Sequence, residues 1–160
     1  MEHRRVSHWL MGAGALATAG IALVFFLFAP VTALSYRDAY PALAHLFWPG
    51  LAFVWCIGLL YGAAMMEYFR VCRRVGQDRS FCMENAVGLA RIALLLAAAG
   101  GLWLAGMGLA LLQPGIHFAP WCLWLLLACA ASLAMAVLAW GLGRLLRRAV
   151  EIKEENDLTV

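Results

Sequence analysis

Charge is what this sequence has least of. Only 13% of its 160 residues are Asp, Glu, Lys or Arg, whereas 65% are hydrophobic. In soluble domains about a quarter of the residues carry a charge. The low charge content and a mean hydropathy of +0.83 together exclude a soluble domain. A chain with so few charges cannot cover a large core with water-soluble surface. We therefore expect most of its exterior to face lipid.

Signatures of catalysis are missing as well. The sequence contains no nucleophile motif, no phosphate-binding glycine loop and no HExxH pattern. Its five cysteines form no CxxC pair and no even set, so we expect no disulfide framework. We accordingly expect neither enzymatic activity nor a bound cofactor. The basic residues stand beside apolar segments, where anionic lipid headgroups account for them, so no direct nucleic-acid binding is expected.

What the sequence does contain is four apolar segments, each long enough for the roughly 20 residues that a bilayer core requires. The predicted spans cover about residues 8–30, 46–69, 86–112 and 120–142, and a tail follows over 143–160. The sequence thus predicts an all-α, polytopic membrane protein, with one four-helix transmembrane bundle over residues 1–160. Pro30 and Pro41 are expected to stop helices on either side of an outer loop.

The distribution of Lys and Arg predicts the orientation. Ten of them fall before the first span, between the second and third spans, or after residue 143, and only Arg37 falls in a loop on the other side. Because basic loops stay inside, we expect both termini in the cytoplasm, a bacterial inner-membrane location and a cytoplasmic helical extension of the last helix. The first apolar run exceeds a signal-peptide core, which favours an uncleaved helix. Cleavage after residue 33 would leave three spans in the same orientation.

Small and aromatic residues within the spans indicate helix contacts. Gly58 and Gly62 form a GxxxG pattern, which allows a neighbouring backbone to approach closely. A stripe of small residues at four-residue spacing in the third span also suits a helix contact: Ala93, Ala97, Gly101 and Ala105. Trp55 and Trp103 lie near mid-membrane. They are interpreted either as lining a pocket for a lipid, quinone or hydrophobic peptide, or as ordinary packing.

Two charged residues lie within predicted spans. Arg91 follows Asn85 by six residues, so it lies about 9 Å further along the third helix. Glu67 lies at a comparable depth in the second span, and a carboxylate suits the planar guanidinium of Arg91. We therefore predict a structural ion pair between Glu67 and Arg91. In the alternative interpretation, Arg91 reaches lipid phosphate and Glu67 faces the cytosol.

Two further pairs of residues have alternative interpretations. His45 and His117 both fall at outer helix ends, but two ligands make a weak signal for a metal or haem site, and none is predicted. Cys72 and Cys82 lie among arginines that would lower a thiol pKa. They form either a redox-sensing pair or two inert thiols.

Two short stretches resemble a known family. The first places Asn85 four residues after Phe81 and then begins a helix with Arg91 and Ile92, and the second is the terminal run EENDLTV. Together they resemble the family called domain of unknown function 2975, which comprises small bacterial four-helix membrane proteins. Members are often encoded beside a small helix-turn-helix regulator. The resemblance therefore implies such a transcription regulator as a cytoplasmic partner.

We interpret the chain as a regulatory or scaffolding membrane protein whose 70–85 loop and tail engage a cytoplasmic partner. The predicted partner-binding face comprises Arg70, Arg73, Arg74, Arg79, Phe81, Asn85, Glu155, Asn156, Asp157 and Leu158. The acidic tail is expected to fold back beside the arginine loop, the alternative being a solvated, frayed tail.

Other partners follow from the same composition. Membrane lipids must surround the spans, and the composition is also compatible with a homo-oligomer. The alternative function is a small transporter or a carrier of a hydrophobic ligand. It is less favoured because Glu67, the only carboxylate in a span, lies near the inner edge of the membrane and not at mid-span.

Overall fold

Helix is the conformation of almost every residue that the structure describes. The structure is a computed structural model, and it describes residues 2–77, 81–112 and 119–157. Its elements are α1 (Glu2–Ala22), the π-helix η1 (Leu23–Phe28), α2 (Ala29–Ala39), the 3-10 helix η2 (Pro41–Leu46), α3 (Phe47–Val75), α4 (Met83–Leu111) and α5 (Ala119–Asp157). Leu, Ala and Met favour helix, and a helix satisfies its own backbone where lipid cannot.

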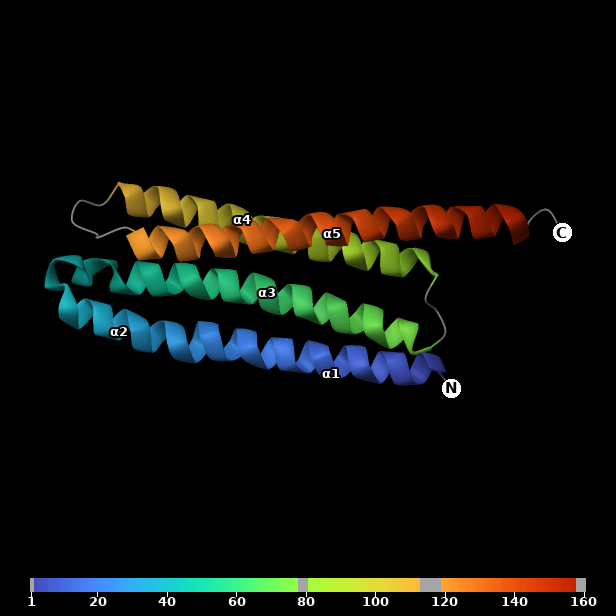
Figure 1. The fold of residues 1–160 in the computed structure, drawn as a ribbon, viewed down its shortest axis with the longest axis horizontal. Helices are drawn as coiled ribbons and strands as arrows, with labels where there is room; N and C mark the ends of the chain where they lie inside the picture. The colour runs from blue at the N-terminus through green and yellow to red at the C-terminus, as the bar shows by residue number, and fades with distance from the viewer. Residues whose placement is uncertain (1, 78–80, 113–118, 158–160) are drawn as a thin grey trace.

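The helices lie nearly antiparallel in a bundle (Figure 1). α1 packs on α3, α3 packs on α4, and α4 packs most extensively on α5. Both termini lie at the end of the bundle where α3 ends and α4 begins (Figure 1). We call this the basic end, because it carries Arg70, Arg73, Arg74 and Arg91. The opposite end is where α2 meets η2.

Four helical segments are long and apolar enough to cross a membrane: His8–Ala39, Ala44–Val75, Met83–Leu111 and Leu123–Glu155. Exposed tryptophans lie toward both ends, with Trp9 and Trp140 toward the basic end and Trp48 and Trp124 toward the opposite end. Such belts occupy the two membrane interfaces. The predicted all-α, four-span membrane fold is confirmed. The cytoplasmic location of the basic end stays a prediction.

The helix expected to end at Pro30 instead continues to Ala39. The residues before Pro30 form a π-helix, in which the Ala29 N–H donates to the Val24 carbonyl five residues back. In this register the next donor would be Pro30, which has no N–H to offer to the Phe25 carbonyl. The indole N–H of Trp55 donates to that carbonyl at 3.2 Å. The π-helix and a tryptophan of α3 together let the chain pass a proline without a break.

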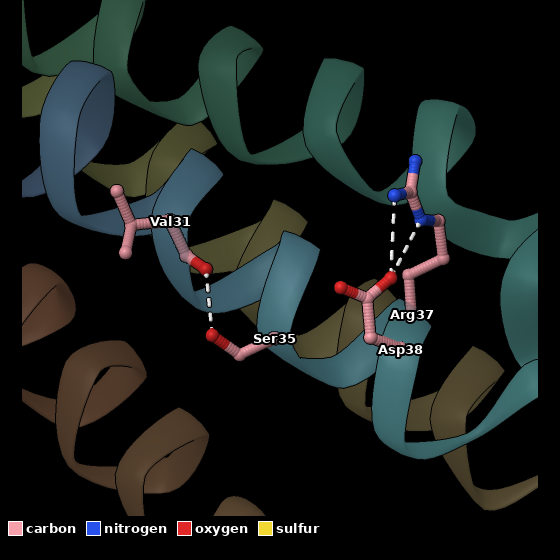
Figure 2. Close-up of polar contacts among 4 residues, drawn as sticks. All are labelled: Val31, Ser35, Arg37 and Asp38. Carbon is pink, nitrogen blue, oxygen red and sulfur yellow. Dashed lines mark hydrogen bonds and ion pairs between the residues drawn. The ribbon is translucent and has the colours of Figure 1, made fainter.

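The opposite end has a charge pair held on α2 itself (Figure 2). Two guanidinium nitrogens of Arg37 lie 3.2 Å from one carboxylate oxygen of Asp38. The same guanidinium lies over the ring of Phe47, 5.4 Å from its centroid. One turn earlier, the Ser35 hydroxyl donates to the Val31 carbonyl at 3.1 Å (Figure 2). The only basic residue predicted to lie outside is thus neutralised by its neighbour.

Aromatic and hydroxyl groups from all four spans meet inside the bundle. The ring of Phe25 lies 5.6 Å from that of Tyr61 and 6.4 Å from that of Trp103. The Trp103 indole donates to the Tyr61 hydroxyl at 3.2 Å, and Tyr61 shares a hydrogen bond with the hydroxyl of Ser132. Ser132 also bonds the Ala128 carbonyl of its own helix. The indole N–H groups of Trp103 and Trp55 therefore both donate hydrogen bonds within the protein.

Small residues make only part of the expected contacts. A Cβ on Gly58 would lie 2.9 Å from the Phe25 ring, so this glycine allows η1 to approach α3, whereas Gly62 faces open space. In the predicted α4 stripe Ala93 is buried, but Ala97, Gly101 and Ala105 are exposed. A four-residue spacing rotates by about 40° per step on an α-helix, so a long stripe leaves the contact face.

Candidate functional site

The candidate site is built around Glu67 at the basic end of α3. Its side chain is only 11% exposed, and one carboxylate oxygen lies 2.5 Å from Arg70 and 3.5 Å from Arg91. The two arginine side chains are 58% and 63% exposed. A buried carboxylate thus holds two guanidinium groups at the surface. The predicted partner Arg91 does lie beside Glu67, and the missed partner Arg70 has the three-residue spacing of a helical ion pair.

A second ion pair joins α3 to α4. The Arg74 side chain lies 3.3 Å from the carboxylate of Glu84 in the first turn of α4. A Cβ on Gly88 would lie 3.0 Å from the Val71 side chain, so the two helices pack closely here. α4 begins at Met83 after an extended Cys82.

Part of the predicted partner-binding face is accessible. α3 continues as helix to Val75, so Arg70, Arg73 and Arg74 project from helix and not from a loop. Arg73 and Phe81 are exposed, Phe81 to 64%. Asn85 is only 1% exposed, so its inclusion in the face is wrong. It lies on the side of α4 that packs into the bundle.

Other members of the predicted face belong to the chain end. Glu155 is exposed on α5. Arg79 and Leu158 lie outside the described residues, as do the side chains of Asn156 and Asp157.

As far as Asp157, the tail does not fold back. α5 runs unbroken to Asp157 and projects past the start of α4 (Figure 1). Val150 is buried, but Glu151 is exposed and pairs with Arg147 of the same helix at 3.2 Å. Folding back would require a break in the helix of α5. Ion pairs with the arginines of α3 would not compensate for that break, because exposed ion pairs contribute only about 0–1 kcal/mol each.

The structure describes three of the four cysteine and histidine candidates. Cys72 is buried within α3 and Cys82 is partly buried at the start of α4, and neither is in a disulfide bond. His45 is exposed on η2, whereas His117 lies outside the described residues. Across residues 2–77, 81–112 and 119–157, no three potential ligands gather as a metal site would need.

Comparison with known proteins places this architecture in a family. The chain is similar to "Uncharacterized membrane protein YoaS" of Bacillus subtilis (strain 168), with 28% identity over 141 residues that cover 88% of each chain. No solved structure matches. The family described as "Protein of unknown function (DUF2975)" matches residues 32–160, which include three of the four spans and both stretches that carried the resemblance. The chain is therefore an integral membrane protein that belongs to this family.

Proposed function

We propose that this protein is a regulatory or scaffolding protein of the bacterial inner membrane that holds a cytoplasmic partner on the extension of α5. The observation that carries the proposal is the charged helix that projects past the bundle (Figure 1). Beyond the buried Val150, every residue from Glu151 to Glu155 is exposed.

The extension has the chemistry of a docking segment. Glu151, Glu154 and Glu155 give it a negative charge that Lys153 offsets only in part. Anionic lipid headgroups repel such a segment, which keeps it away from the membrane surface. Ile152 is 66% exposed among these acids, at a place where a partner could bury it. The partner surface that fits is basic and has an apolar recess.

The resemblance to the family implies the kind of partner. A helix-turn-helix transcription regulator needs a basic surface to bind DNA, and a basic surface complements the acidic extension. Exposed Phe81 lies at the same end of the bundle and offers a second contact. We propose that the protein retains such a regulator at the membrane.

The carrier alternative has weaker support. Neutral groups of Tyr61, Trp103 and Ser132 bond one another in the bundle interior. Glu67 is engaged by two arginines at the basic end. A proton-coupled carrier would need a carboxylate free to titrate on the transport path.

Co-purification tests the proposal. Tagged protein would be solubilised from native membranes, and its companions identified by mass spectrometry. Changing Glu151, Glu154 and Glu155 to Gln should reduce recovery of the partner by roughly tenfold, because complementary charge aids binding. Asp38→Asn at the opposite end is the control and should leave recovery unchanged. If the Gln variant recovers the same companions as the wild type, the docking role of the extension is wrong.

A further inference from the structure

The last turns of α3 form a basic recess on the surface of the bundle. It has a volume of about 340 Å³ and is lined by Arg70, Arg73, Arg74 and Gln77. The ion pair between Arg74 and Glu84 places the first turn of α4 beside it. Arg91 lies near its rim, since Arg91 and Arg70 contact the same oxygen of Glu67.

The recess lies at the level of lipid headgroups. Trp48 and Arg70 are 22 residues apart on one helix, hence about 33 Å, which matches a hydrocarbon core about 30 Å thick. With Trp48 in one interface, Arg70 reaches the other. A second interfacial contact is found toward the same end, where the Arg144 guanidinium lies 4.3 Å from the ring centroid of Trp140.

The charges around the recess do not balance. Four arginines (Arg70, Arg73, Arg74 and Arg91) face two carboxylates (Glu67 and Glu84), which leaves an excess of two positive charges in this part of the described structure. Arg73 is exposed and, among the described residues, pairs with no carboxylate. The buried carboxylate of Glu67 restrains Arg70 and Arg91 at the surface, so the positive charge is positioned before any anion arrives.

An apolar track leads from the recess toward mid-membrane. Leu59, Met66 and Arg73 follow one another at seven-residue spacing on α3, which places them on one stripe of the helix. Leu59 is 64% exposed and Met66 is 59% exposed. The stripe therefore presents cationic groups at headgroup depth and apolar side chains deeper in the membrane, which is the pattern of an amphiphile with an anionic head.

We propose that this recess is a binding site for the phosphate headgroup of an anionic phospholipid, whose acyl chain lies along Leu59 and Met66. Arginine suits phosphate because its planar donors can bind two oxygens at once. Basic recesses between transmembrane helices take anionic headgroups in this way. The site lies on α3 and not on the α5 extension, so it stands or falls independently of the proposed function.

Native mass spectrometry of the full chain tests the site. The protein would be released from nanodiscs of phosphatidylcholine with or without phosphatidylglycerol, and bound lipids counted. The wild type should retain phosphatidylglycerol in preference to phosphatidylcholine. Changing Arg73 and Arg74 to Gln should lower that retention by roughly tenfold. The matched control changes Arg147 and Arg148 to Gln, which removes the same charge from exposed positions of α5 and should leave retention unchanged.

Each other outcome overturns the site. Equal retention of the two lipids by the wild type would contradict headgroup recognition, and equal loss in both variants would reduce the effect to net charge. Displacement of the lipid by millimolar inorganic phosphate would assign the recess to a soluble anion. Circular dichroism and the unfolding midpoint in phosphatidylcholine discs should match the wild type for both variants, so that lost retention reports binding and not misfolding.

Discussion

At the scale of single residues, the burial of Glu67 determines the position of two arginines. A carboxylate that is 11% exposed has lost most of its hydration and depends on Arg70 and Arg91 for compensation. The arginines remain half exposed and can each reach water or lipid phosphate. The cluster is therefore asymmetric: the buried carboxylate depends on the arginines to offset its lost hydration, whereas the exposed arginines keep most of theirs.

This asymmetry predicts the effect of neutralising the acid. We expect Glu67→Gln to lower the free energy of unfolding by about 1–2 kcal/mol, since it removes charge-assisted bonds to two arginines at once. Glu84→Gln is the control, because Glu84 is 54% exposed and its bond to Arg74 is solvated, so a change of about 0–1 kcal/mol is expected. Denaturant titration in one detergent measures both. Equal losses for the two variants would contradict a special role of Glu67.

At the scale of secondary structure, the π-helix before Pro30 is tied to a residue of another helix. The Phe25 carbonyl has lost its backbone donor to the register shift and to the proline, and the Trp55 indole replaces it. Trp55→Phe should therefore destabilise the protein by about 1 kcal/mol, within the range for hydrogen bonds inside membranes. In Pro30→Ala, a restored backbone N–H can donate to that carbonyl.

The two substitutions should therefore be coupled. We expect Trp55→Phe to cost less in the Pro30→Ala background than in the wild type, with a coupling free energy of about 0.5 kcal/mol or more. Unfolding of the four proteins in one double-mutant cycle measures this coupling. Trp48→Phe, at an exposed tryptophan of the same helix, should show none. Additive effects at Trp55 and Pro30 would mean that the indole bond does not substitute for the missing backbone bond.

The same elements show what the sequence can predict. Four apolar runs are visible because hydropathy and length alone determine which segments can span a bilayer. The π-helix is not visible, because a proline normally ends a helix and only the Trp55 indole, thirty residues away in the chain, compensates for its effect. Likewise, the outward projection of α5 depends on an unbroken helix, whereas charge complementarity with the arginines pointed to a folded-back tail.

The part of the candidate site that could be predicted is the part set by the depth of each residue in its membrane span. Glu67 and Arg91 were matched because the helical rise gives the depth of each residue in its span. Depth does not give the rotation of a helix about its axis. Asn85 was assigned to an accessible face through the 70–85 loop and the family motif, and neither shows on which side of α4 it lies.

At the scale of the whole molecule, the two ends differ in charge. Arg37 and Asp38 neutralise each other at the opposite end, while the basic end carries an excess of arginine. The positive-inside rule then predicts that the basic end and both termini face the cytoplasm.

Labelling of single cysteines tests this orientation. In a background without the five native cysteines, Asp38→Cys should react with a membrane-impermeant maleimide in intact cells. Glu154→Cys, on the exposed extension of α5, should react only after the membrane is permeabilised. The reverse pattern would place the basic end outside and would also remove the basis for a cytoplasmic partner.

The bond between Trp55 and the Phe25 carbonyl has a consequence for biogenesis. When the first helix leaves the ribosome and enters the bilayer alone, its Phe25 carbonyl faces hydrocarbon without the donor that α3 later provides. The Phe25 carbonyl of the first span therefore lacks a hydrogen-bond donor until the second span has been synthesised. The first two spans together are the smallest unit in which this carbonyl is satisfied. Insertion should proceed hairpin by hairpin, with Trp55 completing the first one.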